Sequence, residues 1–380
     1  MHDLFLGRFQ VLGRLKPVHF NKTSLTMPRV LIVYQSKPDI VSGLTRGLQN
    51  QGTQVLHFMA DQHHHWVDKY VFHTINKWAH NLRILKKGRF WFTEHKLNHW
   101  NYLNHKLVEV FHKTRPNFVF FIHGIHYSDK TLAQITCPTI GWLVDPVTDP
   151  KRLWQFANRL DWYFSYSQTA ISALNQLGYT KTSYLSHAVD HQQFYPLGIT
   201  QKSIDIAFVG KHSKHREQFI LAALAVTKKV SVYGSRWIAP TFKRPALFFA
   251  IKGSQCYGEK LNQLYNNSKM VLSIIAKPQA VSRLESGINM RPYEVLATGA
   301  LLLSDQYEEL QAELRHGHNL ILFNSVDEFK TVLVQLLQNP DQIATIAANG
   351  RAFIENRFSY DAMAKTILDR FSALETKPSQ

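Results

Sequence analysis

The sequence predicts an α/β protein of two doubly wound domains, each a parallel sheet with helices on both faces. Three observations lead to this prediction. Short apolar runs typical of buried parallel strands recur along the chain, with helical segments between them. These runs fall into two series, separated by the polar stretch His191–Ser203. The length of 380 residues also suits two domains better than one.

The first series begins after Pro28 and is assigned to a domain of residues 28–190. Its expected strands are Val30–Tyr34, Val55–Met59, Phe118–Ile122, Thr139–Val144, Trp162–Ser165 and Thr182–Leu185. Helices are expected between the strands, for example at Ser42–Asn50 and Thr169–Leu177. Strands that alternate with short helices form βαβ units, so the sheet should be parallel.

The second series is assigned to residues 204–358. Its expected strands are Ile204–Val209, Val230–Tyr233, Met270–Ile275, Ala300–Leu303 and Leu320–Phe323. The last helices, roughly Pro340 to Ala373, have no strand to alternate with. We therefore expect the C-terminal helix, in residues 359–380, to cross back to the first domain.

Composition excludes several classes of protein. Two cysteines cannot form a disulfide framework, which favours a reducing compartment, the cytoplasm. No apolar run approaches the roughly 20 residues that a membrane span needs. An excess of 44 Lys and Arg over 27 Asp and Glu gives a net charge of +17. Such a surface should attract phosphate, nucleic acid or anionic lipid.

Residues 1–27 are basic and mildly amphipathic. A membrane-surface helix, a targeting segment and a poorly ordered tail all fit this composition, and the tail is favoured. The stretch lacks the continuous apolar centre and the cleavage site of a secretory signal. A translation start at Met27, directly before the first strand, stays open.

The segment His63–Arg115 interrupts the alternation with a basic and aromatic composition. It holds 10 of the Lys and Arg, 3 of the Asp and Glu, nine of the 20 His and four of the eight Trp. Interleaved cations and aromatics can bind nucleic acid, sugars or lipid headgroups. The alternative, slightly favoured, is a solvated helical insertion whose Trp residues cover the core. As a hypothesis, the segment docks on an anionic membrane, peripherally on its inner face, and its histidines strengthen binding as pH falls.

No metal site is predicted. His63, His64 and His65 are adjacent, and neighbouring His residues rarely converge on one ion. His212 and His215 have a spacing compatible with ligation, but no Cys or carboxylate set accompanies them. We expect no metal and no other cofactor.

The stretch "DIAFVGKHSKHRE" has the layout of a phosphate site. A buried strand ends at Val209, Gly210 opens a tight turn, and Lys211, Lys214 and Arg216 follow as a helix begins near Ser213. A glycine lets the backbone approach a phosphate, and the helix N-terminus and cations neutralise it. The stretch has neither GxGxxG nor the P-loop pattern GxxxxGK[ST].

The stretch "NMRPYEVLATGALLLSD" predicts a short helix followed by a buried strand. Pro292 suits the first turn of a helix at Tyr293–Thr298, and Gly299 suits a residue of positive φ after it. Glu294 either favours the helix N-terminus electrostatically or accepts the hydroxyls of a ribose. In a doubly wound domain this helix start and the Gly210 turn both lie at the carboxyl edge of the sheet. Together they suit a nucleotide diphosphate, and Gly299 keeps the turn compact.

The chain resembles the glycosyltransferases of GT-B fold, in particular the CgeB-like group. Five stretches carry the resemblance and cover most of Ile204–Leu368: "DIAFVGKHSKHRE", "VSVYGSRW", "YGEKLNQLYNNSKMVLSI", "GINMRPYEVLATGALLLSDQYEEL" and "NPDQIATIAANGRAFIENRFSYDAMAKTIL". In the first domain the similarity is limited to "PNFVFFIHG" and "TIGWLVDP".

The resemblance implies two Rossmann-like domains that face a cleft. The second domain would bind a nucleotide-sugar, the first would bind the acceptor, and the enzyme would be a metal-independent hexosyltransferase. Glu294 would contact the donor ribose. The remaining donor residues would be Asn289, Met290 and Arg291 on the sugar-diphosphate side, and Gly210, Lys211 and Arg216 at the diphosphate. Many retaining members carry two Glu with seven residues between them, whereas Ser286 occupies that position here, next to Glu285.

Sugar transfer with inversion needs a general base across the cleft. Asp145, which follows an expected strand, is the first candidate, and His123, His126 and Asp149 come next. Asp145 could instead cap the helix that starts near Pro150, and His123 could be a buried, hydrogen-bonded histidine. Two other functions stay open: a non-catalytic protein that binds nucleic acid or an anionic membrane, and a nucleotide-sugar epimerase.

Overall fold

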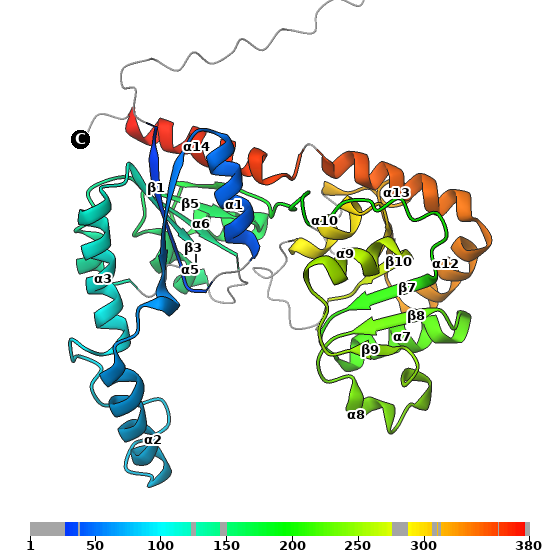
Figure 1. Cartoon of the computed structure of the whole chain (residues 1–380), viewed down its shortest axis with the longest axis horizontal. Helices are drawn as coiled ribbons and strands as arrows, with labels where there is room; N and C mark the ends of the chain where they lie inside the picture. Colours follow the sequence, from blue (N-terminus) through cyan, green and yellow to red (C-terminus); the bar gives the residue numbers. More distant parts are fainter. Residues whose placement is uncertain are drawn as a thin grey trace, which may run out of the picture.

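The structure is a computed structural model of the whole chain, and it describes residues 27–36, 39–122, 127–144, 150–275, 288–305, 310, 313–355 and 357–376. It contains two six-stranded parallel sheets, one in each of two lobes that lie next to each other (Figure 1). The predicted fold class, two doubly wound α/β units, is confirmed. The expectation for residues 1–26 lies outside the described residues.

The first sheet has the strand order β2-β1-β3-β4-β5-β6. Its strands are β1 (Arg29–Tyr34), β2 (Gln54–Met59), β3 (Phe118–Ile122), β4 (Thr139–Leu143), β5 (Trp162–Ser165) and β6 (Thr182–Tyr184). The helices that connect them are α1 (Asp39–Asn50), α3 (His99–Thr114), α4 (Asp129–Leu132), α5 (Pro150–Ala157) and α6 (Gln168–Gln176). Every residue of β3 is buried, because helices pack on both faces of the sheet: α1 on one, and α3, α5 and α6 on the other.

The second sheet has the order β12-β11-β10-β7-β8-β9. Its strands are β7 (Ile204–Val209), β8 (Val230–Tyr233), β9 (Ile251–Gly253), β10 (Ser268–Ser273), β11 (Leu301–Asp305) and β12 (Ile321–Phe323). Its helical elements are α7 (Lys214–Val226), α8 (Ile238–Thr241), η3 (Pro245–Leu247), α9 (Gly258–Asn266), α10 (Met290–Ala297), α12 (Val326–Gln338) and α13 (Pro340–Glu355). The edge strand β9 is not among the predicted strands, because the sequence Ile-Lys-Gly has no apolar run.

The C-terminal helix α14 (Tyr360–Glu375) leaves the second lobe and packs on α1 of the first, as predicted (Figure 1). Its buried residues Tyr360, Met363, Ala364, Ile367 and Phe371 join the core of the first lobe. Contact with α1 is close. A Cβ on Gly47 would lie 2.3 Å from the carbonyl oxygen of Tyr360, so only glycine fits at this point of α1.

The basic segment differs from the expectation in two ways. Its C-terminal part, α3, is an ordinary crossover helix that buries Leu103, Leu107 and Phe111 against the first sheet. The remainder, residues 63–98, projects from the lobe and is called the arm here (Figure 1). The idea that its Trp residues cover the core is wrong, because Trp66 and Trp78 are 64% and 65% exposed.

The arm consists of the π-helix η2 (Asp68–Phe72), the helix α2 (His73–Asn81) and a loop that returns to α3. No helix in the part of the chain that the structure describes is long and apolar enough to cross a membrane.

Candidate functional site

Two glycine turns meet at the carboxyl edge of the second sheet. Gly210 follows β7, and its N–H donates to the carbonyl of Tyr233 at the end of β8 (2.8 Å). Gly234, which comes next, has a φ of +149°, and a Cβ there would lie 1.9 Å from the carbonyl oxygen of Gly210. The indole of Trp237 donates to that same oxygen (2.8 Å). Only glycine fits at position 234, and the contact fixes the backbone of the predicted phosphate turn.

Helix α7 starts at this turn, as expected. Ser213 is its N-cap and accepts a hydrogen bond from the backbone N–H of Arg216 (3.3 Å). The N-terminus of a 13-residue helix therefore lies beside Lys211, whose side chain is exposed. Backbone N–H groups and the helix dipole make such a position favourable for an anion. One of the two histidines considered as metal ligands, His212, instead bonds Glu217 through Nε2 (2.7 Å).

Arg216 has a structural task that the sequence did not indicate. Its guanidinium donates from Nε and Nη2 to the carbonyl of Ile274 (2.9 and 2.7 Å) and from Nη1 to that of Lys211 (2.9 Å). It thereby ties the turn after β7 to the end of β10. Burial, and next the charge of nearby Arg291, lower the pKa of Arg216 to about 10. The group still carries its positive charge at neutral pH and has further N–H donors to offer.

Helix α10 begins at Met290, three residues before the expected start, because Asn289 caps it. The Asn289 side chain accepts from the backbone N–H of Arg291 (3.0 Å). Arg291 and Glu294 are three residues apart and so lie on the same face of the helix. Gly299 follows the helix with a φ of +74°, as the sequence predicted. Asn289 is exposed, whereas Met290, Arg291 and Glu294 are partly buried.

Tyr265, in α9, is fully buried against this face of α10. Both Arg291 and Glu294 are close enough to affect the pKa of its hydroxyl, which burial raises well above its usual value. The Arg291 side chain lies within hydrogen-bonding reach of the Tyr265 hydroxyl and acts to lower its pKa. Nε of Arg291 and the Tyr265 hydroxyl make no hydrogen bond of normal geometry within the described ranges, so this pair could also accommodate a polar ligand. Sequence analysis missed Tyr265 because it looks like an ordinary core aromatic.

Asp305 completes a charged cluster with the two arginines. It ends β11, and its carboxylate accepts from the backbone N–H of Ile275 (2.9 Å). Burial raises the pKa of Asp305 to about 6, although the hydrogen bond and Arg216 act in the opposite direction. His215 lies 3.9 Å away. The cluster therefore spans the carboxyl ends of β7, β10 and β11. In the sequence, Asp305 lies two residues beyond the expected strand Ala300–Leu303, and no role was predicted for it.

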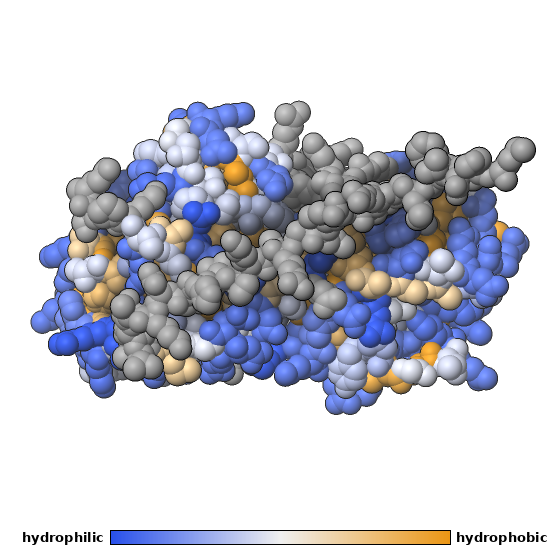
Figure 2. All heavy atoms as spheres, turned by 90° about the horizontal axis from the view of Figure 1, so that it is seen from above, coloured by the Kyte–Doolittle hydropathy of each residue, from blue (hydrophilic) through white to orange (hydrophobic). Residues whose placement is uncertain are grey.

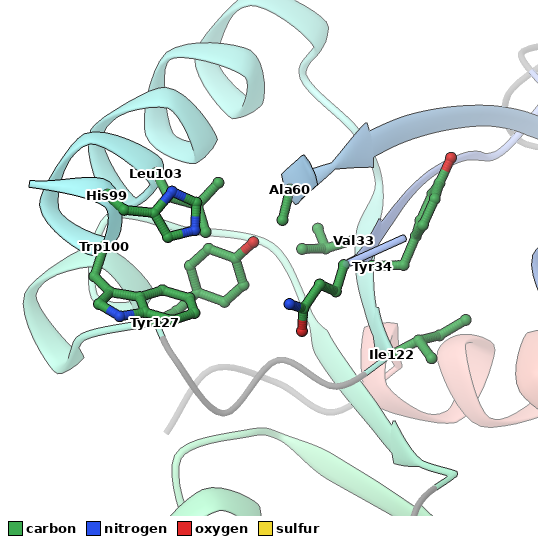
Figure 3. Close-up of a pocket in the computed structure, with 9 residues that line it drawn as sticks. Val33, Tyr34, Ala60, His99, Trp100, Leu103, Ile122 and Tyr127 are labelled. Carbon is green, nitrogen blue, oxygen red and sulfur yellow. The ribbon is translucent and has the colours of Figure 1, made fainter. Parts of the chain in front are cut away.

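The first lobe has a pocket at the carboxyl edge of its own sheet. It is a small, shallow pocket, lined by Val33, Tyr34, Gln35, Ala60, His99, Trp100, Leu103, Ile122 and Tyr127. Figure 3 shows His99, Trp100 and Tyr127 gathered at one end of the pocket and Tyr34 and Ile122 at the other. Burial lowers the pKa of His99, and so does the ring of His64 stacked on it (centroids 4.6 Å apart). This edge is the one at which open α/β sheets bind ligands.

The predicted catalytic candidates Asp145, His123, His126 and Asp149 lie outside the described residues, as do Glu285 and Ser286. The three adjacent histidines of the arm diverge. His63 stacks on Phe58, and His64 stacks on His99. Among the described residues, no group of three or more His, Cys, Asp or Glu is placed to hold a metal ion.

Comparison with known proteins supports the fold and part of the sequence resemblance. Residues 215–369 match a family model described as glycosyl transferase-like. A search of curated proteins found no match.

Among solved structures, the chain is similar to HepE of Anabaena in complex with UDP and glucose (15% identity, TM-score 0.62, covering 91% of this chain and 100% of that one). It is also similar to sucrose-phosphate synthase from Thermosynechococcus elongatus (12%, 0.65, 92% and 99%). A third similar structure is a glycosyltransferase from Rickettsia africae (14%, 0.63, 93% and 100%). These likenesses show that the chain has the GT-B fold of two Rossmann-like units.

Proposed function

We propose that the protein is a glycosyltransferase that takes a sugar from a nucleotide-diphosphate-sugar held at the carboxyl edge of the second sheet. One observation carries the proposal: Arg216, Arg291 and Glu294, from two distant segments, meet there beside the buried hydroxyl of Tyr265. The family match over residues 215–369 supports it. So does the existence of a UDP-glucose complex of HepE, a protein of the same fold.

Each donor residue has a part in this proposal. Lys211, Arg216 and the N-terminus of α7 neutralise the diphosphate, and Gly210 lets the backbone approach it. Arg291 neutralises the sugar side of the diphosphate, and Asn289 and Met290 line the space for the sugar. Glu294 accepts the ribose hydroxyls, and Gly299 keeps the end of α10 compact.

Charge stabilisation then explains the chemistry. Breaking the bond between the anomeric carbon and the diphosphate leaves negative charge on the leaving phosphate. Fixed cations already in place stabilise that charge without reorganising, which lowers the barrier. Such a site needs no metal, so metal independence and hexosyl transfer form part of the proposal, as does membership of the CgeB-like group.

The acceptor is assigned to the first lobe. The pocket of Figure 3 lies at the corresponding edge of the first sheet and offers aromatic faces from Trp100 and Tyr127. Aromatic rings are common in sites that bind sugars or other partly apolar groups. Asp145, and His123 after it, remain our predictions for the catalytic residues. The two cysteines, Cys137 and Cys256, are both unpaired, which suits the proposed cytoplasmic location.

A second candidate is a non-catalytic protein that uses the same fold to bind nucleic acid or an anionic membrane. The exposed Trp side chains of the arm favour it, because surface binding alone would explain them. An epimerase would use the same donor site but would need no acceptor. Turnover of a nucleotide-sugar separates all three functions.

A thermal-shift panel tests the proposal. Ligands that bind only the folded state raise its melting temperature, so nucleoside diphosphates and nucleotide-sugars should raise it more than nucleosides do. The best ligand then enters an assay for release of the nucleoside diphosphate. If no nucleotide raises the melting temperature while polynucleotide or anionic lipid does, the protein is a binding protein.

A further inference from the structure

Exposed apolar side chains are concentrated in two segments. Of the 20 large hydrophobic residues exposed in the described part of the chain, nine lie between Trp66 and Trp91 and four between Ile238 and Phe249. Isolated exposed hydrophobic residues are normal on a soluble protein, but clusters of them mark surfaces of interaction. The clusters lie one in each lobe, and the proposed donor site uses neither.

Six of the nine residues of the first cluster form a stripe along the arm. Val71, Ile75, Trp78 and Leu82, all exposed, recur at the i, i+4, i+7, i+11 spacing of one helix face. Trp66 and Tyr70 are each five residues before a member of this stripe. The i→i+5 hydrogen bonds of the π-helix η2 make each residue turn by less than in an α-helix, so residues five apart lie closer to one face. Trp66 and Tyr70, which are 64% and 63% exposed, therefore extend the stripe at its N-terminal end.

A neighbouring face of the same helix, about 100° round from the stripe, holds the arm together. Phe72, Asn76 and Ala79 are buried there. The Asn76 side chain bonds both backbone groups of Trp91 (2.7 and 3.2 Å), and Phe72 stacks on Phe92 (centroids 4.3 Å apart). The return loop is thus fixed to the inner face, and the stripe of Trp66 to Leu82 faces outward from an ordered unit.

Exposed cations accompany the stripe along the arm. Six of them lie between residues 66 and 92, and all are exposed: Lys69, Lys77, Arg83, Lys86, Lys87 and Arg89. Asp68 is the one acidic residue in that range. Apolar side chains flanked by cations suit a surface that is apolar beneath and negative on top.

The second cluster repeats this combination in the other lobe. Ile238, Phe242, Phe248 and Phe249 are between 66% and 85% exposed in and after α8. Exposed cations accompany them at Arg236, Lys243, Arg244 and Lys252, and residues 234–258 contain no acidic residue. Figure 1 shows α2 and α8 projecting on the same side of the two lobes. The side across from them, seen from above in Figure 2, is mainly hydrophilic where it is coloured.

We propose that the arm and the α8 segment are two membrane-binding segments, through which both lobes bind the surface of an anionic lipid bilayer. Trp and Phe side chains insert at the level of the headgroups, and Lys and Arg pair with lipid phosphates. Single-stranded nucleic acid fits less well, because Val71, Ile75, Leu82 and Ile238 have no aromatic face on which a base could stack. The proposal does not depend on the function of the donor site.

Flotation of the full chain with vesicles tests this directly. Vesicles of phosphatidylcholine alone should bind little, and vesicles with about 30% phosphatidylglycerol should bind at low salt, since screening weakens surface attraction. Trp66→Ser/Trp78→Ser and Phe248→Ser/Phe249→Ser should each lower the partition coefficient by about tenfold or more, because each removes two large apolar side chains from the interface. Leu177→Ser/Val334→Ser, which changes exposed residues outside both clusters, should leave it unchanged.

Two charge-reversal variants, one in the arm and one outside both clusters, give a second, independent comparison. Lys86→Glu/Lys87→Glu should abolish binding at low salt, whereas Lys330→Glu/Lys365→Glu, an identical change on exposed positions of α12 and α14, should not. Tryptophan emission of the wild type should shift to the blue on anionic vesicles and be quenched by brominated lipid. Melting temperatures of all variants confirm that they are folded.

Three outcomes would overturn the proposal. The first is that the protein does not float with anionic vesicles. The second is that the variants of the arm and the α8 segment lose no more vesicle binding than the control variants do. The third is that the same residues bind a single-stranded oligonucleotide, or a second copy of the chain, while the protein does not bind vesicles.

Discussion

The hydroxyl of Tyr184, on the last strand of the first sheet, donates a hydrogen bond to the carboxylate of Glu313 in the second lobe. The other oxygen of Glu313 accepts from the hydroxyl of Tyr293 in α10 (2.9 Å). This second tyrosine lies in the same helix as Arg291 and Glu294. These two hydrogen bonds to Glu313 therefore connect the proposed donor helix of one lobe to the sheet edge of the other.

Removing the hydrogen bond between Tyr184 and Glu313 should lower the free energy of unfolding, and the effects of changing the two residues should not be additive. Tyr184→Phe and Glu313→Ala should each cost at least about 1 kcal/mol, and the double variant should cost less than their sum, because both changes remove the hydrogen bond between these two side chains. Urea unfolding of the four proteins gives the coupling energy. Additive losses would show that the two side chains do not interact in solution.

Glu294→Gln should weaken binding of nucleoside diphosphates about 10- to 100-fold, since a hydrogen bond to a charged acceptor contributes about 1.5–3 kcal/mol. The loss should come from the ribose. Wild type should prefer the ribonucleotide over its 2′,3′-dideoxy form, and the variant should lose that preference. Titration calorimetry with both ligands measures this, and Glu259→Gln, an exposed change in α9, is the control. A variant that keeps the preference contradicts the ribose assignment.

Lys211→Ala and Arg216→Ala should behave differently. Lys211 is exposed, so its loss should weaken diphosphate binding with little change in melting temperature. Arg216 also bonds two backbone carbonyls, so its loss should lower the melting temperature as well. Nucleoside affinity should change little in either variant. Equal losses for nucleoside and diphosphate would argue against the assignment of these cations.

Gly234→Ala should destabilise the protein by several kcal/mol, because its Cβ would overlap the carbonyl oxygen of Gly210 and its φ is +149°. Gly258→Ala is the matched control. Its φ is also positive, at +58°, but a Cβ there meets no atom within 4 Å. The control should cost only about 1 kcal/mol. Similar losses at both positions would mean that the two turns are not in contact.

Asp305 should make stability fall as pH rises from about 4 to about 6. The pKa of Asp305 is raised from 3.8 to about 6 in the folded protein, so the folded state holds the proton more tightly than the unfolded state does. Over this window the unfolded state ionises first, and the loss amounts to roughly 2 kcal/mol. Urea unfolding at pH 4 and pH 6.5 should show this loss in the wild type but not in Asp305→Asn. The exposed change Asp341→Asn should leave the loss in place, and an unaltered slope in Asp305→Asn would contradict the prediction.

The sequence predicted the strands well where burial on both faces leaves a continuous apolar run, as in β3 and β7. It missed β9, because three residues at a sheet edge need no such run. The predicted start of α10 was also too late. Pro292 is typical of the first turn of a helix, but the helix begins earlier because the side chain of Asn289 caps it.

Part of the candidate site could likewise be predicted from the sequence, and part could not. Residue type and spacing indicated Arg216, Arg291 and Glu294, since cations and a carboxylate near strand ends can be recognised in the sequence alone. The hydrogen bonds from Arg216 to Ile274 join residues 58 positions apart, and no local pattern predicts them. Burial of Tyr265, the pKa of Asp305 and the exposure of Trp66 and Trp78 depend likewise on tertiary packing.

The return of α14 to the first lobe has a consequence for synthesis. The apolar face of α1 is covered by Tyr360, Met363 and Phe371, so the ribosome must translate almost the entire chain before that face is shielded. Until then, the first lobe should be a client for chaperones, although its own sheet is complete by residue 184. A stop codon near residue 359 would damage the lobe that is translated first, and a fragment cut at residue 190 should aggregate unless residues 360–376 are supplied in trans.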